Sequence, residues 1–122
     1  METIDQRTAA TAELMHRFNA VFLRHDPSTL NSMIAEDCFI EKITPAPEGD
    51  RCVGRDACVA LWTEIATAPG THFDLEETWT MDDRAIIRWR FWSSDTTSTR
   101  GVNLMRVRNG QIVEAMGYVK GG

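Results

Sequence analysis

Apolar and polar residues alternate in two runs near the end of the chain, joined by an Asn-Gly pair. The runs STRGVNLMRVR and QIVEAMGYVKG lie on either side of Asn109-Gly110. Both residues of such a pair readily adopt the positive φ that a type I′ turn requires, so the pattern predicts a β-hairpin. A hairpin cannot bury its own apolar side, and the upstream chain must therefore supply further strands and helices.

The first part of the chain has the apolar spacing of helices. Residues 3–6 match a capping box, and apolar residues recur at helical spacing over residues 14–22. Asp26-Pro27 predicts the end of this helix and the start of a short second one, because Asp caps free N–H groups and Pro suits the first helical position. A third helix is expected from Arg55 to about Thr67, with its end at residues 68–70.

Three further strands are expected before the hairpin. The first is predicted at residues 38–44, which are rich in β-branched and aromatic residues, and a loop with two prolines follows it. A turn at Asp82-Asp83 separates the second predicted strand from the third, at residues 85–92. In the second strand, alternation would place four apolar residues on one face: Phe73, Leu75, Trp79 and Met81. This order of elements predicts an α+β fold with the helices on one face of an antiparallel sheet.

Composition limits the classes of function. The chain has 122 residues, 43% hydrophobic and 25% charged, which predicts one globular domain over residues 1–122. A net charge of -5 argues against a nucleic-acid surface. No apolar run is long enough to cross a membrane and no signal core opens the chain, so a cytoplasmic protein is expected. Its three cysteines lack C-x-x-C spacing, which predicts reduced thiols; neither a metal nor another cofactor is expected.

Three segments carry a resemblance to a known family. They are PAPEGDRCVGRDACVALW, DDRAIIRWRFW and RGVNLMRVRNGQIVEAMGYVKG, and together with the leading helices they resemble the SnoaL-like branch of the nuclear transport factor 2-like superfamily. The resemblance implies a curved antiparallel sheet wrapped round three N-terminal helices into a cone with an internal cavity. The superfamily includes isomerases, dehydratases, epoxide hydrolases, polyketide cyclases and non-catalytic binding domains, so the fold alone does not select a function.

Strand parity predicts which side chains face that cavity. If the arginines of the last strands point outward, then Asn103 and Met105 point inward on the hairpin, and Trp89 and Phe91 point inward on the strand before it. The expected lining is Phe18, Phe22, Trp62, Trp89, Phe91, Met105 and Tyr118. These aromatic rings would form a pocket for a small apolar molecule, whereas the alternative for the tryptophans is that they fill the core. For Tyr118 the alternative is a sheet edge or an interface.

The outward positions of the same strands include apolar residues. Ile86, Leu104 and Trp92 would lie on the solvent side of the sheet. A contiguous apolar face of this kind favours burial against a partner. We therefore expect a homodimer that packs through the outer sheet face.

Candidate catalytic residues are Glu41, Lys42 and Asn103. Glu41 and Lys42 are adjacent on the first predicted strand, so one of them faces the cavity. An inward Glu41 would act as a base, while an outward one would pair with an arginine. An inward Lys42 would move a proton or hold an anion, unless it extends out at the cavity mouth. Asn103 would donate a hydrogen bond to a ligand oxygen or satisfy a neighbouring backbone group.

The resemblance also allows a comparison with ketosteroid isomerase. It implies that the general-base aspartate of that family falls on or next to Lys42, the oxyanion-hole tyrosine at Phe18 and the protonated aspartate near Asn103. That mechanism needs a carboxylate base and two acidic donors, which these residues do not supply. The expected activity is instead another cofactor-free acid–base reaction on a small apolar carbonyl compound, such as isomerisation, cyclisation or dehydration. The alternative is a non-catalytic binding or dimerisation module.

Overall fold

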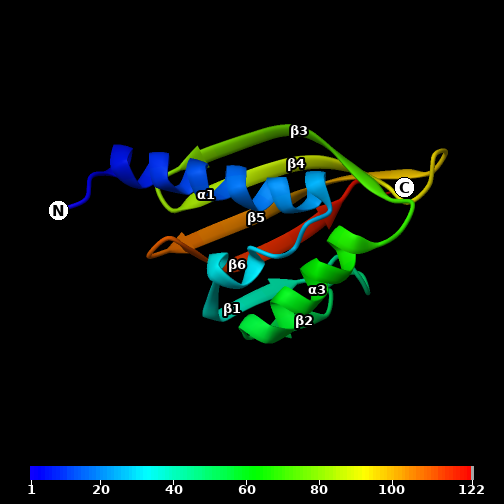
Figure 1. The fold of residues 1–122 in the computed structure, drawn as a ribbon, viewed down its shortest axis with the longest axis horizontal. Coiled ribbons are helices and arrows are strands. Elements are labelled where there is room, and N and C mark those ends of the chain that lie inside the picture. Colours follow the sequence, from blue (N-terminus) through cyan, green and yellow to red (C-terminus); the bar gives the residue numbers. More distant parts are fainter. Residues whose placement is uncertain (122) are drawn as a thin grey trace.

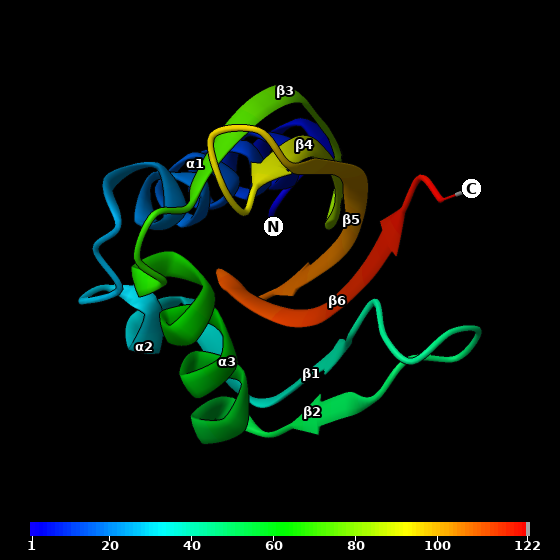
Figure 2. The same cartoon turned by 90° about the vertical axis from the view of Figure 1, so that its right-hand side faces the viewer.

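One curved six-stranded sheet bends round the helices in this computed structural model, which describes residues 1–121 (Figures 1 and 2). The elements in chain order are α1 (Ile4–Arg24), α2 (Leu30–Met33), β1 (Ile34–Glu41), β2 (Arg51–Val53), α3 (Arg55–Thr67), β3 (His72–Met81), β4 (Arg84–Trp92), β5 (Ser98–Arg108) and β6 (Gln111–Val119). The strand order is β2-β1-β6-β5-β4-β3, so the first strand lies beside the last. The predicted hairpin forms the β5–β6 pair.

The predicted α+β class, with helices against one face of a curved sheet, is confirmed. The sheet is mixed, however, and not wholly antiparallel, because β1 pairs with β6 in parallel. Parallel neighbours need a long crossover, and here α3 and four strands intervene between them. The third helix accordingly follows β1 and β2 in the chain and does not precede all the strands.

Two of the three helices begin where they were predicted to begin. Thr3 and Gln6 form the predicted capping box of α1, and α3 spans the predicted residues. The start of α2 was predicted wrongly, because this helix begins at Leu30 and not at Asp26-Pro27. The Asp26 carboxylate accepts a hydrogen bond from the Ser28 backbone N–H (3.0 Å). This local turn competes with helix formation, so Asp26 stabilises a turn and does not cap a helix.

The first strand is shifted from its predicted position. It runs from Ile34 to Glu41, whereas residues 38–44 were expected. Lys42 donates its backbone N–H to Asp50 (2.7 Å), and Asp50 donates to Thr44 (3.0 Å). The loop thus pairs with itself where β1 ends. The short β2 strand that follows it, Arg51–Val53, was not predicted.

In β3 the predicted single apolar face is interrupted. Its register with β4 shifts between Leu75 and Glu77, so one additional residue reverses the alternation. Phe73 lies on the inner face, while Trp79 and Met81 are exposed. A bulge of this kind leaves no clear mark in the sequence pattern.

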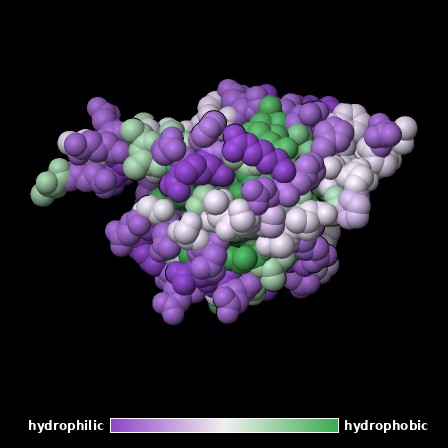
Figure 3. All heavy atoms as spheres, in the orientation of Figure 1, coloured by the Kyte–Doolittle hydropathy of each residue, from purple (hydrophilic) through white to green (hydrophobic). Residues whose placement is uncertain are grey.

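The hydrophobic core lies between the helices and the inner sheet face. It includes Leu14 and Phe18 of α1, Trp62 of α3 and the inward residues of the strands. Cys38 and Cys58 are buried free thiols, and desolvation raises the pKa of both. The face of the molecule drawn in Figure 3 is mostly hydrophilic, with hydrophobic atoms visible in separate small patches. Within residues 1–121, no helix is long and apolar enough to cross a membrane.

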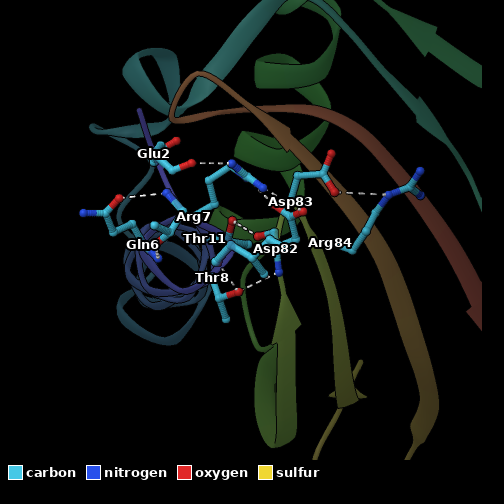
Figure 4. Close-up of polar contacts among 10 residues, drawn as sticks. Glu2, Gln6, Arg7, Thr8, Thr11, Asp82, Asp83 and Arg84 are labelled. Atoms are coloured by element: carbon cyan, nitrogen blue, oxygen red, sulfur yellow. Dashed lines mark hydrogen bonds and ion pairs between the residues drawn. The ribbon is translucent and has the colours of Figure 1, made fainter.

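Four residues attach α1 to the β3–β4 turn (Figure 4). The Arg7 guanidinium donates to both carboxylate oxygens of Asp82 (2.5 and 3.3 Å). Thr11 donates its hydroxyl hydrogen to the Asp82 carbonyl (2.6 Å), and Thr8 accepts from the Asp82 N–H (2.7 Å). Both backbone groups of Asp82 are therefore satisfied by one helix. These bonds fix α1 across the end of the sheet and so position the cavity residues that this helix carries.

Acid is expected to weaken this attachment. The hydrogen bond from Arg7, together with its charge, holds the pKa of Asp82 below its usual value. Two more carboxylates have a lowered pKa for the same reason, Glu76 beside Arg100 and Asp37 beside Arg108. A carboxyl whose folded pKa is depressed contributes stability above its unfolded pKa of about 4, and that stability is lost as the pH falls through the folded pKa.

The expected result is a free energy of unfolding that falls as the pH is lowered below about 4. Urea denaturation at a series of pH values measures it, and Asp82→Asn is the matched variant because it cannot ionise. The variant should lose less stability than the wild type over the same acid range. Identical pH profiles for the two proteins would contradict the role of the Arg7–Asp82 pair.

Candidate functional site

A cavity of about 550 Å³ lies between the helices and the inner face of the sheet. Its walls come from α1, α3, β1 with the loop after it, and β3 to β6. Aromatic rings make up much of the wall: Phe18, Phe22, Trp62, Phe73, Trp89 and Phe91. Ile43, Leu75 and Val119 are the more exposed apolar lining residues, so the mouth of the cavity lies beside them.

The aromatic wall is held together by edge-to-face contacts. The Phe18 ring lies 4.8 Å from Trp62, with the planes at 73°, and joins α1 to α3. Phe73 lies 5.8 Å from Trp89 at 85°, which joins β3 to β4. Such geometry matches the positive ring edge to the negative face and adds to the burial energy. The wall is therefore a packed surface suited to a flat, apolar molecule.

The structure places five of the seven predicted pocket residues along this cavity, namely Phe18, Phe22, Trp62, Trp89 and Phe91. The other two lie elsewhere. Met105 is buried in the core and is not among the lining residues. Tyr118 pairs with the outward Val102 and is half exposed on the outer face. Its inward neighbours Gly117 and Val119 take the cavity positions, because side chains alternate along a strand.

Glu41 has its carboxylate on the outer face of the sheet. Its neighbour Ile40 is buried against the core, so the next side chain points the other way. Arg51 lies directly opposite on β2, and its guanidinium is 3.4 Å from the Glu41 carboxylate. Glu41 thus borders the cavity without directing its charge into it, which is the outward arrangement considered above.

Lys42 lies at the cavity just beyond the end of β1. Lys42 directly follows Glu41, the last residue of β1, which pairs with Met116 of β6. No ion pair to Lys42 forms within residues 1–121. The two predicted polar residues, Lys42 and Asn103, both line the cavity, and the Ile43 side chain lies over Gly117 beside them, with its Cγ1 3.0 Å from where a Cβ of Gly117 would stand.

Asn103 lines the cavity with a fixed orientation. Its Oδ1 accepts a hydrogen bond from the Trp89 indole Nε1 (3.2 Å). An indole nitrogen can only donate, so the bonded atom of the carboxamide must be the oxygen. Within residues 1–121, Asn103 Nδ2 has no hydrogen-bond partner, yet no buried side-chain nitrogen there is unpaired. Nδ2 is therefore accessible, and it can donate to a molecule in the cavity.

Three polar lining residues were not predicted, namely Asn19, Thr44 and Thr99, and Asn19 is the most buried of them. Asn19 is buried on α1, and its Nδ2 lies 3.4 Å from the Thr78 hydroxyl. The sequence offered a signal, because this amide is flanked by Phe18 and by the other apolar residues of the helix. Asn19 is at the limit of hydrogen-bond distance from Thr78, so it too can reach a ligand.

The cavity offers hydrogen-bond donors in an apolar surround. The amides of Asn19 and Asn103, the Lys42 amine and the hydroxyls of Thr44 and Thr99 are its polar side chains apart from Glu41. Among the described residues, no cluster of His, Cys, Asp or Glu is arranged to hold a metal ion. The site is therefore suited to binding a ligand oxygen.

The arrangement of helices and sheet has close counterparts among solved structures. A nuclear transport factor 2-like protein of unknown function from Mesorhizobium loti is 63% identical, with 94% of each chain covered and a TM-score of 0.93. A steroid delta-isomerase from Pseudomonas aeruginosa shares the fold at 14% identity, covering 93% of this chain and 81% of its own, with a TM-score of 0.78. A provisionally assigned polyketide cyclase from Sinorhizobium meliloti does so at 17% identity, covering 86% and 93%, with a TM-score of 0.71.

The fold is thus that of the nuclear transport factor 2-like proteins. The family model of the SnoaL-like domain matches residues 15–115, and the chain belongs to this family. The resemblance seen in the sequence is confirmed. Among curated protein sequences, none matches this chain.

Proposed function

We propose that this protein binds a small apolar carbonyl compound in its cavity and catalyses a proton transfer at the carbon next to the carbonyl group, without a cofactor. The observation that carries the proposal is the free amide N–H₂ of Asn103, held by Trp89 within an apolar wall. Donating to the carbonyl oxygen stabilises the negative charge that develops there when the neighbouring carbon loses a proton. Structural neighbours that include a steroid delta-isomerase support a reaction of this general kind.

Lys42 is the proposed proton carrier. Its amine takes the proton from the carbon, the electron pair of the broken C–H bond moves into an enolate, and the ammonium returns the proton to the same or a conjugated carbon. A ligand in the cavity would contact both Lys42 and Asn103, which are lining residues, with the Ile43 side chain covering Gly117. Glu41 is not assigned this role, since its carboxylate pairs with Arg51 on the outer face.

A second candidate function is ligand binding without turnover. The observation that favours it is the same outward position of Glu41, which leaves the cavity without an inward carboxylate base. In that case Asn103 and Lys42 would hold a ligand oxygen, and the aromatic wall would enclose its apolar part.

Deuterium exchange distinguishes these functions without knowledge of the product. Small cyclic and aryl ketones are incubated with the protein in D₂O, and loss of the proton signal next to the carbonyl is followed by NMR. Proton transfer predicts exchange catalysed by the wild type, reduced about 100-fold or more in Lys42→Met, because an acid–base group contributes about that factor. Glu41→Gln is the matched control and should retain the wild-type rate. Equal rates in the wild type and Lys42→Met would contradict the assignment, and binding without exchange would favour the second function.

We also propose that two copies pack through the outer sheet face. Trp79, Ile86, Leu104 and Met116 are directly opposed from strand to strand and form one apolar row across β3 to β6. Most of this row is exposed, and a second copy could cover it with the same row. Trp92, also expected on this face, lies at the far end of β4, half-buried, stacked on His72 and hydrogen-bonded to Asp74.

If two copies pack through this apolar row, a charged side chain placed in the row should lower the molecular mass of the protein in solution. Sedimentation equilibrium at micromolar concentration should give a dimer for the wild type and a monomer for Leu104→Glu. Thr99→Glu, on the inner face of the same strand, serves as the control and should remain dimeric. A monomeric wild type would contradict this proposal without affecting the cavity.

A further inference from the structure

The indole of Trp89 lies across the neighbouring strand at Gly101. The two residues are directly opposite in the β4–β5 pairing. A Cβ atom at Gly101 would stand 2.7 Å from both Cζ2 and Cη2 of the indole, closer than real Cβ contacts allow. Only glycine therefore leaves room for the ring at this position.

In this position the indole N–H of Trp89 reaches the side chain of Asn103. Asn103 is two residues beyond Gly101 on β5, so both face the cavity side of the sheet. The indole Nε1 reaches Asn103 Oδ1 (3.2 Å), and the same oxygen would be 3.6 Å from a Cβ placed on Gly117. The oxygen thus lies between the indole and the backbone of β6. The amide nitrogen, on the other side of the same carbon atom, is left for the cavity.

We infer that Trp89 and Gly101 are positioning residues that hold Asn103 as a hydrogen-bond donor and make the cavity selective for ligands with an acceptor oxygen, such as ketones, aldehydes and esters, over ligands with an N–H. An unrestrained asparagine turns its amide to suit either kind of ligand, because its two ends have similar shape and opposite hydrogen-bonding character. Here, exchanging the two ends of the Asn103 amide would break the hydrogen bond from Trp89. It would also place the amide N–H₂ against the indole N–H, so that two donors would face each other. The inference rests on the proposed use of the cavity for a ligand and is independent of proton transfer.

Two matched ligands test the selectivity. In 1-indanone and indole, the same position of a fused bicyclic frame carries a C=O acceptor or an N–H donor, and neither compound is charged. Isothermal titration calorimetry with the full chain gives the dissociation constant of each. The wild type should bind 1-indanone about tenfold more tightly, since an N–H facing the fixed amide nitrogen leaves two donors without partners. Equal affinities, or a preference for indole, would overturn the inference.

Trp89→Phe shows whether the indole sets this preference. Phenylalanine keeps an aromatic ring over Gly101 and removes only the N–H donor, so the Asn103 amide becomes free to turn. The ratio of the two affinities should fall from about tenfold to about twofold or less. A role limited to packing would change both affinities together and leave the ratio at its wild-type value, which would also overturn the inference. Asn103→Leu is the second variant, and it should likewise remove the preference.

The outcomes separate this inference from the proposed function. A preference for 1-indanone that depends on Trp89, without deuterium exchange, would support the inference and contradict proton transfer. Deuterium exchange by the wild type, together with an unchanged affinity ratio in Trp89→Phe, would support proton transfer and contradict the inference. If neither ligand binds, the inferred ligand class is wrong, whichever reaction is later found.

Discussion

Replacing Gly101 with alanine is expected to lower the free energy of unfolding by about 3 kcal/mol, because the added methyl group overpacks a filled site. The new Cβ would meet the backbone oxygen of Tyr118 and stand 2.7 Å from two ring carbons of Trp89. The backbone contact is the more costly of the two, since it can be relieved only by separating β5 from β6. Guanidinium denaturation followed by circular dichroism measures the loss.

Gly121→Ala is the control for this substitution. A Cβ at Gly121 would have no neighbour within 4 Å, so the same change of residue type adds no contact there. This variant should unfold at the wild-type denaturant concentration. Equal stability of the Gly101→Ala and Gly121→Ala proteins would show that the indole does not lie over Gly101.

Truncating Ile112 to alanine is expected to cost about 2–5 kcal/mol, the usual range for a large aliphatic side chain removed from a filled core. Ile112 is completely buried and pairs with Ile34, also completely buried, where β1 begins alongside β6. This parallel pair joins the first and last strands, so a void here weakens the packing between β1 and β6.

The exposed Ile4 provides a matched isoleucine-to-alanine control. It opens α1 and has about half of its surface in solvent. Ile4→Ala should change stability by less than about 0.5 kcal/mol, as surface substitutions usually do. Urea denaturation of both variants measures the difference, and similar values would contradict the assignment of Ile112 to the core.

Local signals predicted the parts of the fold that local chemistry determines. The capping box at residues 3–6, the limits of α3 and the turns at residues 82–83 and 109–110 follow from short motifs, and the structure contains all of them. The arginines of β4 and β5 also gave the correct inward residues, because alternation is strict in strands without a bulge.

The remaining features depend on contacts between distant segments. The parallel pairing of β1 with β6 joins residues more than seventy positions apart, and nothing in residues 34–41 specifies it. In β3 a single bulge moved Trp79 and Met81 to the outer face. The outward side of Glu41 follows from its pairing with Arg51 and Met116, whereas the sequence showed only that one of Glu41 and Lys42 faces the cavity. An error in register exchanges the two faces of a strand.

The sequence identified several of the residues that line the cavity, but it did not show how their side chains are arranged. Asn103 was singled out as an inward amide, but the sequence contained no sign of the hydrogen bond that fixes its direction. That bond requires the β4–β5 register and the space above Gly101, both of which are properties of the folded sheet. The sequence supplied the polar group, and the tertiary structure determined which end of it faces the cavity.

A crystal structure of the protein with 1-indanone bound would test the central claim most directly. We predict that the ketone lies among the aromatic rings of the cavity, with its oxygen about 3 Å from Asn103 Nδ2 and with the Trp89 bond to Oδ1 intact. A ketone oxygen directed away from Asn103, or a carboxamide turned so that Trp89 no longer donates to it, would contradict the claim.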